Sequence, residues 1–261
     1  MSPDLLSVAV TREVSAEEMI QPEYLPALLT DPRSLARRVK PELDTRGFAM
    51  LPGFFTPAAL EVMRETAYQR REYCVGSEKR KPLIGAELQG TVFYQIAKSD
   101  WVQALSNPIL RPFGYQVDKD DVYPAVGILQ GSNSQDAVYD FHFDATCLTL
   151  AVPVIMPDAS RPLHGSFRIW PNVRQFSTSW LKNKFYWRVM RTTWLRDRFR
   201  NFTVDFHPGN LYLFYGFRSW HGVDTLDETS LRVNCLINVG GPFFHQTKKK
   251  PLLRPSERYE P

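Results

Sequence analysis

Three side chains that can bind a metal ion occur in two short stretches of the chain. His142 and Asp144 are separated by one residue, and His221 follows almost eighty residues later. Residues two apart on a β-strand point to the same face, so the first imidazole and the carboxylate can bind one ion together. A His-x-Asp pair also arises by chance in a chain of this length, and either histidine alone fits a structural role. The metal-site prediction therefore rests on all three residues together with Arg232.

Arg232 is predicted to lie opposite His221. An apolar strand, LYLFYGF, precedes His221, and another, LRVNCLINV, contains Arg232; DTLDETS between them is rich in turn-forming residues. If the two strands pair as a hairpin centred between Leu226 and Asp227, the β-carbons of His221 and Arg232 lie about 5 Å apart. The guanidinium would then lie one ligand length from the metal, where it can bind a carboxylate through two hydrogen bonds.

The order of these four residues has a parallel in a known family. Two histidines and one carboxylate on one side of a metal leave three coordination positions open, as in non-haem Fe(II) oxygenases. His142, Asp144, His221 and, eleven residues later, Arg232 resemble the motif of the Fe(II)/2-oxoglutarate-dependent dioxygenase superfamily. HPGNLYLFYGFRSWHGV and GSFRIWPN are similar to strands of that superfamily. RGFAMLPGFFTPAALEVMRE resembles the N-terminal entry of phytanoyl-CoA-hydroxylase-like and prolyl-hydroxylase-like members, and the matching segments cover most of residues 46–242.

The resemblance implies a double-stranded β-helix (jelly-roll) core and the cofactors Fe(II), 2-oxoglutarate and O2. It implies that His142, Asp144 and His221 are the catalytic metal ligands and that Arg232 binds the 2-oxoglutarate carboxylate. The implied reaction is hydroxylation, or another oxidation, of an unactivated C–H bond of a small molecule in amino-acid or natural-product metabolism, with succinate and CO2 as co-products. Halogenating relatives have Gly or Ala in place of Asp144, so this carboxylate argues against halogenation.

Two further polar residues are candidates for cofactor contacts. Asn234 alternates with Arg232, and Thr146 with Asp144, so both are predicted to face inward. For each, a buried polar residue bonded to backbone is an equally good interpretation. The alternate residues of the same strand are predicted to face outward, under the N-terminal helices: Val233, Cys235, Ile237 and Val239.

The run into the first histidine holds the candidate substrate contacts Gln130, Asn133 and Asp140, although a hydrophilic loop explains these residues better. Trp220 is next to His221, but strict alternation turns its ring away from the metal, so a packing role is favoured.

The elements that would position these residues are mainly β with N-terminal helices. Residues 15–45 are predicted to be helical, beginning at Ser15, and Thr56-Pro57 begins another helix after a short strand at Phe48 to Leu51. From about residue 120, short β-rich runs separated by turn residues predict an antiparallel jelly-roll or cupin-like barrel. We expect one oxygenase domain over 1–261. Its parts are a helical support region (1–115), a jelly-roll core (120–242) with a helical insertion at about 178–200, and a C-terminal tail (243–261).

The insertion carries seven Lys and Arg residues against one acid, Asp197. It is expected to border the substrate entrance, where its cations could meet an acidic substrate or an acidic carrier protein. The interpretation favoured is a solvated basic face on a helix whose apolar side chains pack inward. Those side chains are Trp180, Trp187, Met190, Trp194 and Leu195.

The composition argues against several classes of protein. The 261 residues are 43% hydrophobic, as in globular proteins, and the net charge of +4 is too small to indicate a nucleic-acid partner. Cys74, Cys147 and Cys235 form no close pair, which argues against disulfides and thiolate zinc sites. The N-terminus lacks the pattern of a signal peptide, and the longest apolar run, at 148–156, is too short to cross a bilayer, so a cytoplasmic location is expected. Nothing in the sequence indicates an oligomeric state.

Two other classes of protein share the predicted fold. A non-catalytic jelly-roll binding module would need neither the complete ligand set nor the arginine. A cupin-like metalloenzyme that does not use 2-oxoglutarate would need the metal ligands alone.

Overall fold

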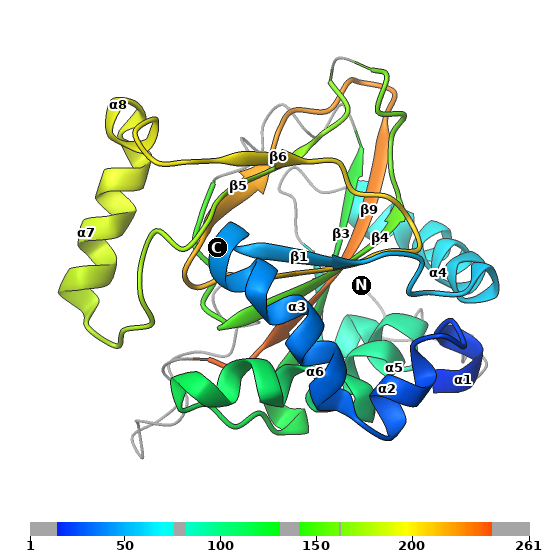
Figure 1. Ribbon diagram of the computed structural model, residues 1–261. Coiled ribbons are helices and arrows are strands. Elements are labelled where there is room, and N and C mark those ends of the chain that lie inside the picture. The colour runs from blue at the N-terminus through cyan, green and yellow to red at the C-terminus, as the bar shows by residue number, and fades with distance from the viewer. Residues whose placement is uncertain (1–14, 76–81, 131–140, 162, 242–261) are drawn as a thin grey trace.

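The computed structural model describes residues 15–75, 82–130, 141–161 and 163–241 (Figure 1). Its α-helices are α1 (Ala16–Met19), α2 (Leu25–Leu29), α3 (Pro32–Arg46), α4 (Pro57–Val75), α5 (Val92–Lys98), α6 (Asp100–Leu110), α7 (Trp180–Arg191) and α8 (Thr193–Arg196). Its strands are β1 (Phe48–Leu51), β2 (Leu83–Ile84), β3 (Val122–Gln130), β4 (Leu148–Ile155), β5 (Phe167–Trp170), β6 (Phe202–Val204), β7 (Leu211–Phe214), β8 (Trp220–Val223) and β9 (Leu231–Val239). Short 3-10 turns cover Gly85–Leu88, Arg111–Phe113 and Lys119–Asp121. The predicted C-terminal tail, 243–261, lies outside the described residues.

The strands form two antiparallel sheets. The larger sheet has the order β1-β7-β4-β9-β3-β2, and the smaller has the order β6-β5-β8. Two strands of the larger sheet, β1 and β2, come from the N-terminal region that was predicted to be helical support. The predicted double-stranded β-helix core with N-terminal helices is confirmed.

The predicted helix starts are also present. Ser15 Oγ accepts a hydrogen bond from the Glu18 backbone N–H at 3.3 Å, and Thr56 Oγ1 accepts one from Ala59 N–H at 3.1 Å. The stretch 15–45 is not one helix but three, α1 to α3. Pro26 and Pro32 lie in the first turns of α2 and α3, where proline fits but cannot continue a preceding helix.

The predicted hairpin between the strands of His221 and Arg232 is wrong. β8 pairs with β5 in the smaller sheet, whereas β9 lies between β3 and β4 in the larger one. A turn at 215–219 takes the chain from β7 into the other sheet, so LYLFYGF and His221 are not on one strand. Just after β8 the backbone still runs beside the segment that precedes β5, because Asp224 N–H donates to the Ser166 carbonyl at 2.9 Å. The turn residues that follow therefore connect two sheets.

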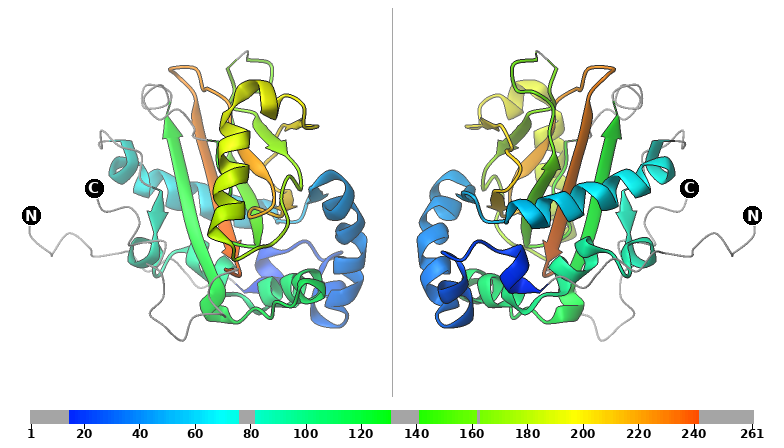
Figure 2. Two further views of the ribbon diagram at one scale, coloured as in Figure 1. Left: turned by 90° about the vertical axis from the view of Figure 1, so that its left-hand side faces the viewer. Right: turned by 90° about the vertical axis from the view of Figure 1, so that its right-hand side faces the viewer.

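The outer face of the larger sheet is covered by the N-terminal helices, and α4 lies across its strands (Figure 2). The outward-facing side chains of β9 pack into this helical core, as the alternation predicted, and are at most 1% exposed: Val233, Cys235, Ile237 and Val239. A separate cluster fills the space between the sheets with Phe167, Phe206, Tyr212 and Phe214. Aromatic packing thus holds the two sheets at a defined separation.

The insertion after β5 is helical, as predicted, but its tryptophans do not pack inward. Trp180, Trp187 and Trp194 are 65%, 43% and 61% exposed, and only Met190 among the five expected side chains is fully buried. Met190 packs on the body of the fold against Trp170 and Trp220, whereas the tryptophans lie on the sides of the insertion that face away from these residues. None of the helices in the described part of the chain is long and apolar enough to cross a membrane.

Candidate metal centre

The three predicted metal ligands lie together. One ligand atom from each of His142, Asp144 and His221 can be chosen so that all lie within 4.8 Å of one another. Asp144 Oδ1 is 3.2 Å from His142 Nε2 and 3.4 Å from His221 Nε2. This is the only cluster of its kind among the residues that the structure describes, and its donor set is the two-histidine, one-carboxylate set that suits Fe(II).

Backbone pairing sets the two histidines side by side. His142 forms an isolated antiparallel bridge with His221, whose backbone groups exchange hydrogen bonds of 2.8 and 3.0 Å. Their rings are 4.7 Å apart between centroids. On its other side β8 pairs with β5, where Ile169 is opposite His221. His221 thus belongs to the smaller sheet, and His142 lies beside its edge strand β8.

Asp144 is held from the opposite direction by the larger sheet. Its Oδ2 accepts a hydrogen bond of 2.6 Å from Thr149 Oγ1 on β4, and its backbone N–H donates to the Gly216 carbonyl at 3.0 Å. A β-carbon at Gly216 would lie 2.0 Å from Asp144 Oδ2, so only glycine leaves room for this carboxylate. Oδ2 is thereby committed to Thr149, and Oδ1 faces the histidines.

A second hydrogen bond fixes the imidazole of His221. Its Nδ1 lies 3.0 Å from the Ser219 carbonyl. Because a carbonyl can only accept, Nδ1 carries a proton, and Nε2 is the nitrogen that faces Asp144 Oδ1 and can bind a metal. The His221 side chain is 6% exposed, whereas that of His142 is 54% exposed, so the centre is open on the His142 side.

Electrostatics keep Asp144 ionised. Burial by itself would raise the pKa of its carboxyl, but the charge of His221 and the hydrogen bonds from both imidazoles lower that pKa well below its ordinary value. A carboxylate that is stabilised by adjacent positive charge is equally suited to a divalent cation. The geometry and the charge of the site therefore fit the metal that the sequence implies.

Arg174 lies beside this centre and was not predicted. Its guanidinium carbon is 3.9 Å from the ring centroid of Phe143 and 3.9 Å from that of Phe217, while Nε donates to the Phe217 carbonyl at 2.6 Å. Nη1 donates to Asn183 Oδ1 of α7 at 3.3 Å. Burial lowers the pKa of Arg174 to about 10, and the nearby Asp144 partly offsets the shift, so the cation persists at neutral pH.

Arg232 and Asn234 face the space between the sheets, as predicted, and both are buried. The Arg232 guanidinium is 5.8 Å from the ring of Phe206, which stacks on Phe167; the Phe167 ring in turn lies 5.7 Å from that of His221. Oδ1 of Asn234 has no hydrogen-bond partner among the described residues. A buried amide oxygen without a partner is uncommon, and it can accept a hydrogen bond from a ligand or a water in the space between the sheets.

The other predicted contacts have different surroundings. Thr146 is buried, and its Oγ1 lies 3.4 Å from Asn238 Oδ1, at the end of β9 remote from Arg232. The amide oxygen of Gln130 accepts two hydrogen bonds from Arg71 of α4. Asn133 and Asp140 lie outside the described residues. Trp220 packs with Trp170 and Met190, as its expected packing role requires.

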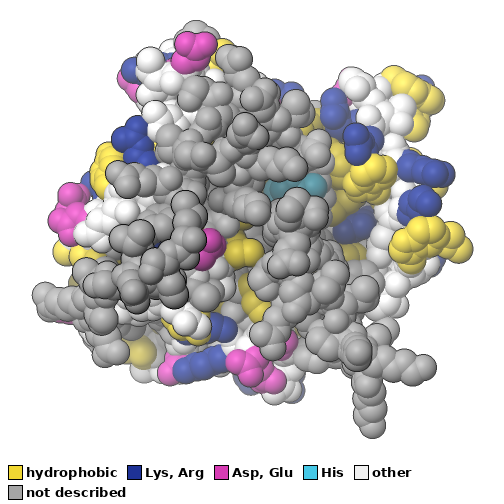
Figure 3. Space-filling model, turned by 180° about the vertical axis from the view of Figure 1, so that it is seen from behind, with side chains coloured by type: hydrophobic (Ala, Val, Ile, Leu, Met, Phe, Trp, Pro, Cys, Tyr) yellow, Lys and Arg dark blue, Asp and Glu magenta, His cyan; other side chains and the backbone are white. Residues whose placement is uncertain are grey.

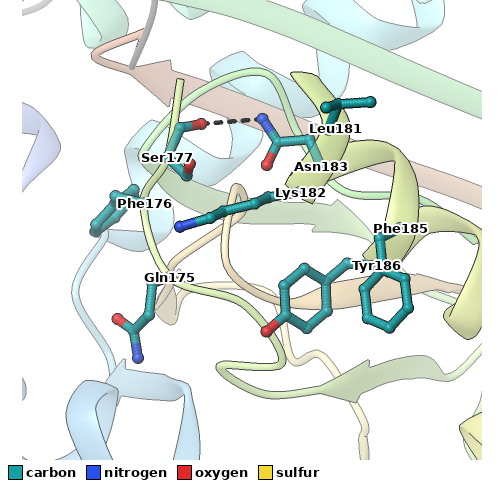
Figure 4. Close-up of a pocket in the computed structure, with 8 residues that line it drawn as sticks. All are labelled: Gln175, Phe176, Ser177, Leu181, Lys182, Asn183, Phe185 and Tyr186. Carbon is teal, nitrogen blue, oxygen red and sulfur yellow. Dashed lines mark hydrogen bonds between the residues drawn. The ribbon is translucent and has the colours of Figure 1, made fainter. Parts of the chain in front are cut away.

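A cavity of about 510 Å³ lies between α7 and the segment that follows Arg174 (Figure 4). Phe176 and Lys182 line it on facing sides, and Asn183 Nδ2 donates to the Ser177 carbonyl at 2.9 Å. Asn183 therefore ties the cavity wall to Arg174, and through it to the loop of the metal ligands. A smaller cavity of about 140 Å³ is lined by residues that include Phe206, His164 and Asp205.

No family model and no curated protein matches the chain. Solved structures do. A non-haem α-ketoglutarate-dependent carbocyclase, SnoK, from nogalamycin biosynthesis matches with a TM-score of 0.55 and 12% identity over 80% of this chain and 85% of that one. Apo HygX from Streptomyces hygroscopicus has a TM-score of 0.52 at 15% identity, over 80% and 87% of the two chains. A prolyl hydroxylase from Trichoplax adhaerens has a TM-score of 0.50 at 16% identity, over 82% and 92%.

The chain has the fold of these enzymes. Within this fold, the sequence pointed to all three members of the His142, Asp144 and His221 cluster but missed the residues that position them. Thr149 follows Asp144 by five residues in an apolar run, and Gly216 interrupts LYLFYGF. A polar residue in an apolar strand and a glycine inside a strand pattern are both recognisable signals. Arg174 gave no such signal, since it follows a predicted strand in a plain loop.

Proposed function

We propose that the protein is an Fe(II)- and 2-oxoglutarate-dependent oxygenase that hydroxylates or otherwise oxidises an unactivated C–H bond of a small molecule, with release of succinate and CO2. The observation that carries this proposal is the His142, Asp144 and His221 cluster. It lies on a fold shared with α-ketoglutarate-dependent enzymes. Neither a binding module nor a structural protein needs a carboxylate and two imidazoles arranged in this way.

Each residue has a distinct task in this proposal. His142 Nε2, Asp144 Oδ1 and His221 Nε2 would hold the iron on one side. Together with 2-oxoglutarate and O2, the bound iron supplies the oxidising power. Thr149 keeps Oδ2 of the aspartate occupied, so that the carboxylate binds through one oxygen. Three coordination positions are then left for co-substrates.

Arg232 and Asn234 would bind the distal carboxylate of 2-oxoglutarate. A guanidinium presents paired N–H donors that match a carboxylate, and an amide adds a further donor. Phe206 lies against the Arg232 guanidinium and its neighbour Phe167 lies against His221, so apolar rings line one side of the space between them. Charge and shape at this end of β9 thus suit an anionic co-substrate.

The substrate would approach from the side on which His142 is exposed. The small molecule would belong to amino-acid or natural-product metabolism, and the second of these is supported by SnoK, which is described as a carbocyclase from nogalamycin biosynthesis. The carboxylate of Asp144 occupies the position that a halide would need, so oxygen insertion, desaturation or ring closure is favoured over halogenation.

The test is anaerobic titration of the protein with Fe(II) and 2-oxoglutarate. Chelation of iron by the 2-oxo acid should produce a weak visible charge-transfer band, and admission of O2 should release succinate. His221→Ala should abolish both signals, and Arg232→Met should weaken the affinity for 2-oxoglutarate while it leaves Fe(II) binding intact.

His164→Ala is the matched control, because His164 is a histidine that is not part of the metal cluster. A wild-type protein without the band, or a His221→Ala variant with the wild-type band, would refute the proposal. Iron binding without any effect of 2-oxoglutarate would instead indicate a cupin-like metalloenzyme.

A further inference from the structure

The helical insertion exposes an unusual amount of apolar surface. Ten large hydrophobic side chains are exposed in the described part of the chain, and six of them lie within residues 180–199. These six are Trp180 (65%), Leu181 (72%), Phe185 (61%), Trp187 (43%), Trp194 (61%) and Phe199 (37%). Single exposed apolar residues are normal on protein surfaces, but a contiguous group marks an interaction site. We call this face of α7 and α8, together with its cations, the insertion surface.

Cations alternate with the tryptophans in a regular pattern. Trp180, Trp187 and Trp194 are seven residues apart, and each is followed four residues later by Lys184, Arg191 or Arg198. The charged groups lie 4.5, 4.5 and 4.8 Å from the corresponding ring centroids. Residues four apart share one face of a helix, which accounts for the two pairs on α7. Arg198 lies just after α8, and its contact with Trp194 makes a third cation–π pair. Apolar and basic groups are therefore mixed on one face, as Figure 3 shows along this edge of the molecule.

The charge of this surface selects an anionic partner. Residues 178–200 contain seven cations and one acid, Asp197, which lies 3.8 Å from Arg196. A second copy of the same surface would repel it. A partner must thus supply negative charge and must also accept exposed Trp, Leu and Phe side chains.

The mixture of aromatic and basic side chains on the insertion surface favours a lipid partner over a protein partner. In protein–protein interfaces the buried centre is depleted of charge, and charged groups form a rim. Here a cation lies against each tryptophan ring, so a protein that buried the rings would also bury the cations. At a bilayer surface, tryptophan sits at the level of the headgroups and basic side chains reach the phosphates. Both groups are then satisfied at one depth.

We propose that the insertion surface binds the surface of an anionic phospholipid bilayer, with α7 lying in the interface plane. Leu181 and Phe185 would enter the acyl boundary, and Lys184, Arg188 and Arg191 would contact headgroup phosphates. The same two apolar residues line the cavity beside α7, so the apolar area continues past the helix. This binding requires no iron and is independent of the proposed catalytic function.

The experiment is co-sedimentation of the full-length protein with two kinds of vesicle. One contains phosphatidylcholine alone, and the other contains equal parts of phosphatidylcholine and phosphatidylglycerol. The protein should bind the anionic vesicles and not the neutral ones, and added salt should weaken binding. Each cation contributes about fivefold in affinity, so Arg188→Glu/Arg191→Glu should lower binding by at least roughly 25-fold. Leu181→Ser should lower it by about tenfold.

Matched controls come from elsewhere on the surface. Leu29→Ser on α2 removes a leucine that is 63% exposed, and Arg33→Glu/Arg37→Glu on α3 reverses two exposed cations. Both helices lie away from α7 (Figure 1), so each control should bind like wild type. The proposal is overturned if anionic vesicles fail to bind at low salt, or if the insertion variants and the controls lose binding equally. It is also overturned if a single-stranded oligonucleotide or an acidic protein binds this surface and the vesicles do not.

Discussion

Replacing Gly216 by alanine should damage the metal centre selectively. A β-carbon at this position would lie 2.0 Å from Asp144 Oδ2, 2.6 Å from Thr149 Oγ1 and 2.8 Å from Asp144 Cβ. Real contacts of a β-carbon are essentially never shorter than 3.0 Å, so the carboxylate must move by at least 1 Å. It cannot move as a unit with its backbone, because the Asp144 N–H is bonded to the Gly216 carbonyl.

The size of the effect follows from how strictly a metal defines its ligand distances. Observed metal–ligand distances vary by only about 0.2 Å, so a displacement of 1 Å removes Asp144 from the coordination sphere. Perturbing a residue that merely supports a ligand typically costs 10- to 100-fold in metal affinity. Loss of the ligand itself should therefore cost at least about 100-fold, or about 2.7 kcal/mol. The crowding should also cost about 1–3 kcal/mol in folding stability, which leaves the variant folded.

Anaerobic calorimetry with Fe(II) measures the affinity, and circular dichroism checks the fold. The matched control is Gly127→Ala, because a β-carbon there meets only the Asn234 carbonyl, at 4.0 Å. The control should bind Fe(II) as wild type does. If Gly216→Ala bound Fe(II) within about threefold of wild type, well short of the loss expected for a displaced ligand, the account of how Asp144 is positioned would be wrong.

Three further variants test other parts of the account. Thr149→Val keeps the side-chain volume but removes the hydrogen bond to Asp144, so Fe(II) affinity in the same calorimetry should fall about 10- to 100-fold. Arg174→Met removes a buried cation from between two aromatic rings and should lower the free energy of unfolding, measured in urea, by about 2–3 kcal/mol. A loss below about 0.5 kcal/mol would contradict a stabilising role for the contacts of Arg174 with Phe143 and Phe217. The pKa of His164 is raised, chiefly because Nδ1 donates a hydrogen bond to the Arg161 carbonyl and also because Nε2 lies beside Asp205. The protonated ring therefore stabilises the folded protein; this contribution is complete below the unfolded pKa and is lost as the pH rises through the folded pKa. His164→Gln should therefore flatten the fall in melting temperature from pH 6 to pH 8, which is worth only a few tenths of a kcal/mol at such an exposed pair.

Local patterns predicted most of the strands, because each is a short β-rich run bounded by turn residues. The nine residues of β3 coincide with the predicted run VYPAVGILQ, and the outward face of β9 follows from apolar residues at every second position. The same logic failed for the pairing of β8 with β9. Equal distance from a turn implies pairing only when both strands stay in one sheet, and here the chain changes sheets on both sides of His221. The spacing of eleven residues between His221 and Arg232 therefore does not arise from a hairpin.

The cluster of His142, Asp144 and His221 was predictable because His-x-Asp and a later histidine carry their chemistry in their residue types. The exposed tryptophans of α7 were not, since a large apolar side chain is ordinarily buried and its cation partner becomes visible only in three dimensions. Arg174 shows the same limit at the site itself. Its role depends on Phe143, Phe217 and Asn183, which come from three separate segments, and no local pattern relates them. These contacts join the helix that carries the insertion surface to the residues next to His142, Asp144 and Gly216. A displacement of α7 must therefore either break the hydrogen bond between Asn183 and Arg174 or move the loop that holds the metal ligands.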